Sequence, residues 1–408
     1  MIRFFPAVLL IALGSVGTAL AGSSSRLGPL AERPNWKSLD VFQETITRED
    51  FVALLDQVYA PGGAWNDMIR VEADQALVKT GAGKTFWSLR FAPSREQASP
   101  VRRYWRGKAE LPDVTPGKPL NGVKIALDPG HIGGDWAKVE ERWFQIGNSV
   151  PVTEGDMTLR VARMLKDRLE KLGATVALTR SKPSPVTSMR PKQLLSEARL
   201  SLIDKEQDIT PVSLQKEADR LFYRAAEIRR RAQLVNTAIK PDLVLCLHFN
   251  AEAWGNEAQP TLSELNHLHF LVTGSFSADE LSYEDQRFNM LQKLLSRAYP
   301  EELAVTERIA RSMASATKLP PYEYIGGNAI KVGKSPYIWA RNLLANRLFH
   351  SPVVYLEPYV MNNREVFARI QAGDYEGLRK VGGKMRPSIY REYVDSVVQG
   401  LVDYYSSN

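Results

Sequence analysis

The sequence predicts an α/β fold, in which a mostly parallel sheet is flanked by helices, preceded by a small N-terminal mixed α+β module. From Val123 onward, short apolar runs alternate with segments whose apolar residues recur at helical spacing, a pattern typical of strands that alternate with helices. Strands are expected at residues 123–127, 175–178, 243–247, 269–272 and 353–356, with helices that include 154–172, 214–238 and 304–317.

The module is expected to comprise residues 37–118. Thr47 precedes an apolar run and marks a helix start, and two apolar runs around the glycine-rich residues 81–84 predict a hairpin. Residues 110–122 are rich in Pro and Gly and separate this module from a larger domain, 119–408. Within that domain, residues of about 181–228 look like an insertion. It is either a peripheral helical elaboration, which is slightly favoured, or a lid or regulatory element over the cleft.

The first residues predict export to the periplasm or cell envelope. Residues 1–21 have a charged start, an apolar run and small residues before the expected cleavage point, as a signal peptide does, and 22–36 look like a linker. No membrane span is expected after cleavage. Cys246 is the only cysteine, so no internal disulfide can form, and the net charge of +7 favours polyanionic partners such as acidic wall polymers. No basic block with interleaved aromatic residues is present, which argues against nucleic acid.

Polar residues follow the predicted strands where a ligand site is expected. His131 closes the sequence Asp-Pro-Gly-His after the first strand, Glu154 begins a helix, and His248 follows a third strand. Ligands of open α/β sheets bind at the carboxyl ends of the strands, and two His with one Glu are the ligand set of a catalytic zinc site. Each residue taken singly also fits a packed histidine or a helix-start carboxylate, so the metal site and the structural alternative both remain open. Glu357, at the end of the last strand, is a candidate general base.

The ordered series of motifs resembles the zinc-dependent N-acetylmuramoyl-L-alanine amidases of the amidase-3 family over about residues 120–408. The matching residues are Asp128 to His131, Glu154, 173–180, Arg231 with Asn236, His248 with Asn250, and 355–362. The resemblance implies that His131, Glu154 and His248 bind Zn²⁺ and that Glu357 is the catalytic base. It implies hydrolysis of the amide between N-acetylmuramic acid and L-alanine in peptidoglycan.

Three further residues are weaker site candidates. Asp128 and Asn250 either orient the metal ligands or act as a turn-forming aspartate and an asparagine that caps a strand end. Arg341 either pairs with a carboxylate of the peptide stem or is a plain surface arginine. The sequence also departs from the family pattern, because Ile132 interrupts the usual pair of glycines after the first histidine and Phe249 stands where a small residue is usual.

Two other functions fit the same residues. One is a zinc peptidase that acts on other cell-wall or free peptides, and the other is a non-catalytic peptidoglycan-binding protein. The presence of all four key residues argues against the second. The module at 37–118 is the candidate surface for an envelope activator or a localisation partner.

Overall fold

The computed structural model describes residues 26–81, 85–255 and 259–407. The predicted signal peptide and the first part of the predicted linker lie outside these residues. Within them, none of the helices combines the length and hydropathy needed to cross a bilayer.

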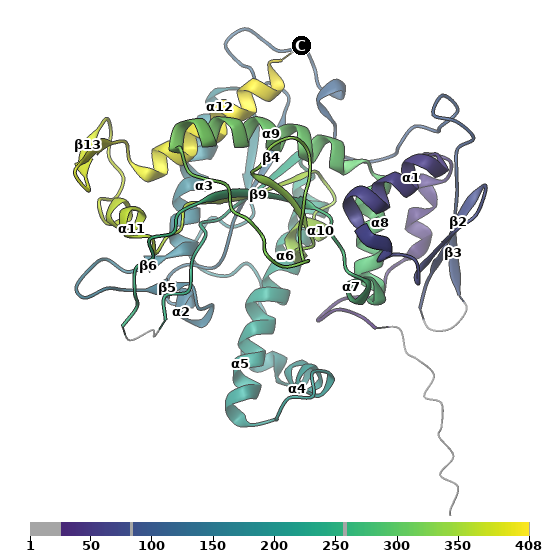
Figure 1. Cartoon of the computed structure of the whole chain (residues 1–408), viewed down its shortest axis with the longest axis horizontal. Helices are drawn as coiled ribbons and strands as arrows, with labels where there is room; N and C mark the ends of the chain where they lie inside the picture. Colours follow the sequence, from purple (N-terminus) through teal and green to yellow (C-terminus); the bar gives the residue numbers. More distant parts are fainter. Residues whose placement is uncertain (1–25, 82–84, 256–258, 408) are drawn as a thin grey trace, which may run out of the picture.

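A seven-stranded sheet forms the centre of the larger unit and confirms the predicted fold class (Figure 1). Its four neighbouring strands β7, β4, β8 and β12 run parallel, β9 is antiparallel to β12, and β11 is parallel to β9. In sheet order the strands are β10 (Ile330–Lys331), β11 (Ile338–Arg341), β9 (Leu268–Thr273), β12 (Val353–Pro358), β8 (Leu243–Leu247), β4 (Lys124–Pro129) and β7 (Thr175–Leu178).

Helices cover both faces of this sheet, which explains why every residue of β8 is buried. One face shares a core with α3 (Glu154–Lys171), α9 (Ala298–Thr317) and α12 (Ile389–Tyr405), and α12 packs on both others. The opposite face packs on α6 (Glu227–Leu234) and α10 (Leu344–Leu348). The remaining elements are α2 (Trp136–Val139), α7 (Ala278–Ser282), α8 (Glu284–Leu295), α11 (Arg364–Gln371), β5 (Trp143–Phe144), β6 (Val152–Thr153), β13 (Arg379–Val381) and β14 (Lys384–Arg386).

The N-terminal module has the predicted mixed composition. It contains α1 (Arg48–Leu54), which Thr47 caps as expected, and a three-stranded antiparallel sheet of β1 (Ile69–Val71), β2 (Gln75–Lys79) and β3 (Phe86–Arg90). The module joins the core of the larger unit, because the Phe276 amide donates to the Tyr59 carbonyl at 2.6 Å and the aromatic side chains of both belong to one buried cluster.

The predicted insertion contains two packed helices that extend away from the sheet (Figure 1). They are α4 (Leu195–Asp204) and α5 (Pro211–Leu221), and we call residues 191–226 the arm. Thr210 caps α5 through its side chain and Pro211 occupies the first helical position, where proline loses no hydrogen bond. The chain continues through a π-turn at Phe222–Ala226 into α6, so the arm is joined directly to a helix that covers the sheet.

Candidate metal centre and catalytic cavity

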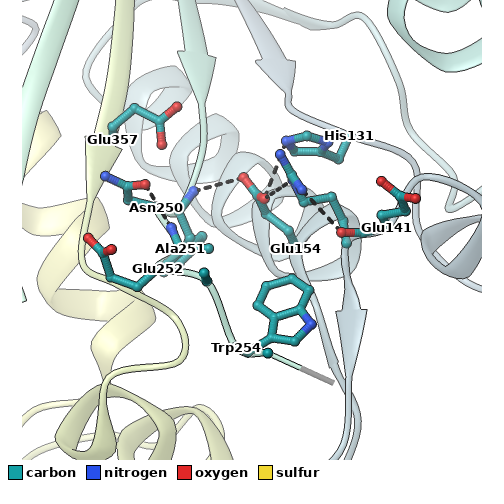
Figure 2. A pocket seen from close by; sticks show the side chains of 12 residues that line it. His131, Glu141, Glu154, Asn250, Ala251, Glu252, Trp254 and Glu357 are labelled. Carbon is teal, nitrogen blue, oxygen red and sulfur yellow. Dashed lines mark hydrogen bonds and ion pairs between the residues drawn. The ribbon is translucent and has the colours of Figure 1, made fainter. Parts of the chain in front are cut away.

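The structure brings together the three residues that the sequence predicts as metal ligands. His131 follows β4, Glu154 is the first residue of α3, and His248 follows β8. One ligand atom from each of the three lies within 4.8 Å of the others. In Figure 2 the carboxylate of Glu154 points toward His131, and Glu357 lies on the opposite side of the cavity.

Close backbone packing makes this meeting of three elements possible. His131 has a φ of 60°, a left-handed conformation that non-glycine residues seldom adopt. A Cβ at Gly130 would lie 2.2 Å from the His248 ring, and a Cβ at Gly155 would lie 2.3 Å from the carbonyl of Ile132. Glycine at these two positions therefore allows the β4 loop to contact both His248 and the first turn of α3.

A buried arginine, Arg231, binds the loop that carries His131 through hydrogen bonds. The Arg231 guanidinium donates to the carbonyls of Pro129 and His131, both at 2.7 Å. It also forms ion pairs with Glu227 at 2.8 Å and with Asp128 at 3.3 Å. Asp128, which the sequence offers as an orienting residue, thus contacts the arginine that holds the loop of His131.

Glu140 contacts the first histidine directly, although no sequence pattern pointed to it, because it stands in a polar stretch beside Glu141. The Glu140 carboxylate lies 2.9 Å from Nδ1 of His131 and accepts the backbone N–H of Ile132 at 2.6 Å. This contact turns Nε2 of His131 toward Glu154, at 3.2 Å. Burial raises the pKa of Glu140 to about 7.

The electrostatics of His131, Glu154 and His248 favour a charged Glu154 between two imidazoles. Burial alone would raise the pKa of Glu154, but His131, His248 and Arg142 outweigh it and lower the pKa. Burial holds the pKa of His131 well below its ordinary value. For His248, burial would lower the pKa, but the hydrogen bond with Glu154 and the charge of Glu357 outweigh it and raise the pKa. The ring of His248 also stacks on Tyr355, at 4.3 Å between centroids.

Glu357, near the end of β12, is among the residues that line a cavity beside these ligands. The cavity has a volume of about 530 Å³. Burial raises the pKa of Glu357 to about 7, although the charge of His248 opposes this shift. Trp254 also lines the cavity, and its ring packs on Phe144 at 5.2 Å.

The two other predicted residues differ in their distance from the cavity. Asn250 lines it, and its side-chain oxygen accepts the N–H of Ala251 at 2.7 Å. Arg341 is not among the described residues that line the cavity. Its guanidinium donates to the Tyr324 hydroxyl at 3.2 Å, and its charge lowers the pKa of Glu357.

Comparison with known proteins decides the family. The model of the family described as N-acetylmuramoyl-L-alanine amidase, amidase-3, matches residues 125–380, more than half of the chain. The chain belongs to the amidase-3 family. The probable cell wall amidase LytH of Staphylococcus aureus is 37% identical over 84 residues, which are 21% of this chain. The matched part of the chain spans about a quarter of the length of that relative, 26%.

Solved structures of amidases are also similar to the chain, at low identity. Ami1 from Mycobacterium abscessus has a TM-score of 0.39 and 17% identity, with 70% of this chain and 100% of that chain covered. AmiC2 of Nostoc punctiforme has a TM-score of 0.37 and 13% identity, with 71% and 98% covered.

The donor set of this amidase-3 chain fits a metal ion. Two imidazoles and one carboxylate come from three separate elements, and the His131 ring already has a carboxylate on its second nitrogen, as metal-binding histidines usually do. His131 and Glu154 line the cavity together with Glu357, so a metal ion held by the first two residues and His248 would be accessible to a substrate in this cavity. The chemistry of the site therefore permits metal-assisted hydrolysis.

Proposed function

We propose that this protein is an exported zinc-dependent amidase that hydrolyses the amide between N-acetylmuramic acid and L-alanine in peptidoglycan. The observation that carries the proposal is the meeting of His131, Glu154 and His248 beside a cavity that Glu357 also lines. Membership of the amidase-3 family supports the substrate, and the pattern of residues 1–21 supports export to the periplasm or cell envelope.

Zinc bound by these three residues would lower the pKa of water and polarise the scissile carbonyl. Glu357 takes the proton of the attacking water and delivers a proton to the leaving amine of alanine. A buried carboxyl whose pKa is raised to about 7 is well placed to gain and lose a proton at neutral pH. Glu140 keeps the His131 ring in one orientation, and Asp128 acts through Arg231 on the same loop.

A digest of purified peptidoglycan tests the proposal. The protein is assayed with and without a chelator and beside Glu357→Ala, and new L-alanine amino termini and new reducing sugar ends are measured separately. We expect metal-dependent release of alanine amino termini without reducing ends, and loss of this release in the variant. A zinc-loaded protein that leaves the wall intact but cleaves free peptides would instead be a peptidase, and a protein that binds no metal would refute the site.

A further inference from the structure

A second groove starts at the edge of the catalytic cavity and runs along the arm. It has a volume of about 660 Å³ and lies between α5 and the segment around α2. Glu141 lines both this groove and the catalytic cavity, so the two are adjacent. The charged side chains along the groove are Lys138, Lys216, Arg220 and Arg224, with Glu141 and Asp219.

The arm forms a fixed wall of this groove. Ile132, the residue after the first metal ligand, is fully buried in a cluster with Leu221 and Phe222 of the arm. Trp136, at the start of α2, packs on Phe222 with 5.0 Å between ring centroids. Because close-packed apolar contacts join the base of the arm to the metal-binding loop, the groove keeps a defined position relative to the catalytic cavity.

Three of the cations in the groove are available to a ligand. Lys138, Lys216 and Arg224 are exposed. Within the described part of the chain, the one ion pair that they make is between Lys216 and Glu141, at 3.7 Å, with side chains 76% and 50% exposed. A contact of this length between exposed groups is weak and is easily exchanged for a ligand.

The other charges in the groove are already satisfied. Arg220 pairs with Glu217 at 2.6 Å, and Asp219 accepts a hydrogen bond from Gln215 at 2.8 Å. Aromatic rings lie beside two of the free cations, since Lys138 Nζ is 4.6 Å from the centre of the Trp143 ring and the Arg224 guanidinium is 5.7 Å from that of Tyr223. The groove therefore offers cationic groups beside apolar surface, which suits a peptide that bears carboxylates.

We propose that this groove is a subsite for the carboxylates of the peptide stem, bound by Lys216 and Arg224 of the arm and Lys138 of α2. The inference rests on the proposed function, because it takes the scissile amide to lie at the metal centre. A stem held there leaves the catalytic cavity past Glu141 and enters the groove, where its free carboxylates meet the three cations. The arm is then the element that selects stems by their charge.

Binding of a reaction product tests this subsite without turnover. The probe is the stem tripeptide L-alanyl-γ-D-glutamyl-diaminopimelate with free carboxylates, compared by titration calorimetry with the same peptide carrying amides in their place. We expect Lys216→Ala/Arg224→Ala to weaken binding of the acidic peptide by about 3- to 10-fold, with a smaller salt dependence, and to leave the amidated peptide unaffected. The charge reversal Lys216→Glu/Arg224→Glu should weaken it further.

The matched control is Lys192→Ala/Arg199→Ala, which removes the same charge from exposed positions of the arm outside the groove. Equal affinities of the groove variant, the control and the unmodified protein for the acidic peptide would overturn the proposal. The two hypotheses fail separately. If the protein is an active amidase and its groove variant keeps the affinity and KM of the unmodified protein, the subsite alone is rejected. If the protein lacks amidase activity but binds the peptide in a charge-dependent way, only the proposed function is rejected.

Discussion

Replacement of Glu140 by Gln probes the contact that holds His131, which we propose as the first metal ligand. Both neighbours of the Glu140 carboxylate are donors when His131 binds a metal through Nε2, because Nδ1 then carries the proton and the backbone N–H of Ile132 also points at this carboxylate. A carboxylate accepts from both. A glutamine has one acceptor oxygen, so its NH₂ group must face one of the two donors and leave it without a partner.

The free-energy cost of the unpaired donor in Glu140→Gln follows from the burial of this position. Glu140 is 6% exposed, so water cannot replace the lost partner, and an unsatisfied buried donor costs about 1–3 kcal/mol. Loss of such an orienting contact typically weakens metal binding by about 10- to 100-fold, which corresponds to about 1.4–2.8 kcal/mol and lies within this range of energies. We therefore expect Glu140→Gln to raise the zinc dissociation constant by that factor, measured by competition with a chromophoric chelator.

Glu141→Gln is the matched control, because it removes the same charge from the adjacent, half-exposed residue that does not contact His131. The control should bind zinc as the unmodified protein does. If Glu140→Gln also did so, the carboxylate would not orient the ligand and the reasoning from the two donors would be refuted.

Three further perturbations concern the same cavity. Gly130→Ala places a methyl group 2.2 Å from the His248 ring and should abolish zinc binding measured by metal analysis, whereas Gly327→Ala, with open space around it, should not. Glu357→Gln should retain zinc but lose amide hydrolysis, and loss of both would contradict its role as base. Arg341→Ala removes a charge that lowers the pKa of Glu357, so this pKa rises above about 7. Because the base acts when deprotonated, the acid limb of the kcat/KM profile should move to higher pH, and an unmoved limb would refute the coupling.

The sequence was sufficient for the elements that follow simple patterns. β7 and β8 have the predicted bounds, because buried central strands are short apolar runs. It did not predict α8, whose buried face includes Asp285, Arg287 and Lys293. These polar side chains obscure the apolar spacing on which a helix prediction depends, and some of their partners, such as Arg229 for Asp285, are distant in the sequence.

The candidate site also contains residues that follow a simple sequence pattern and residues that do not. His131, Glu154 and His248 each stand next to a predicted strand or helix end, so a rule about sheet edges predicted that they lie close together. The same rule left the metal site and the structural alternative both open. Glu140 acts within nine residues of its partner, yet nothing in its neighbourhood distinguishes it from Glu141, and only the backbone path between β4 and α3 decides which of the two carboxylates reaches the ring. The groove could not be predicted from the sequence either, because it depends on how the arm packs against α2.

Ile132 connects the packing of the arm with that of the loop that carries His131. Its side chain is fully buried in the arm cluster, its N–H donates to Glu140, and its carbonyl lies against Gly155 at the start of α3. Burial of such a side chain contributes about 1.5–3 kcal/mol, which would be lost if the arm separated from the loop. The orientation of His131 and the position of the groove therefore both depend on the packing around Ile132, one of the two residues at which the sequence departs from the family pattern.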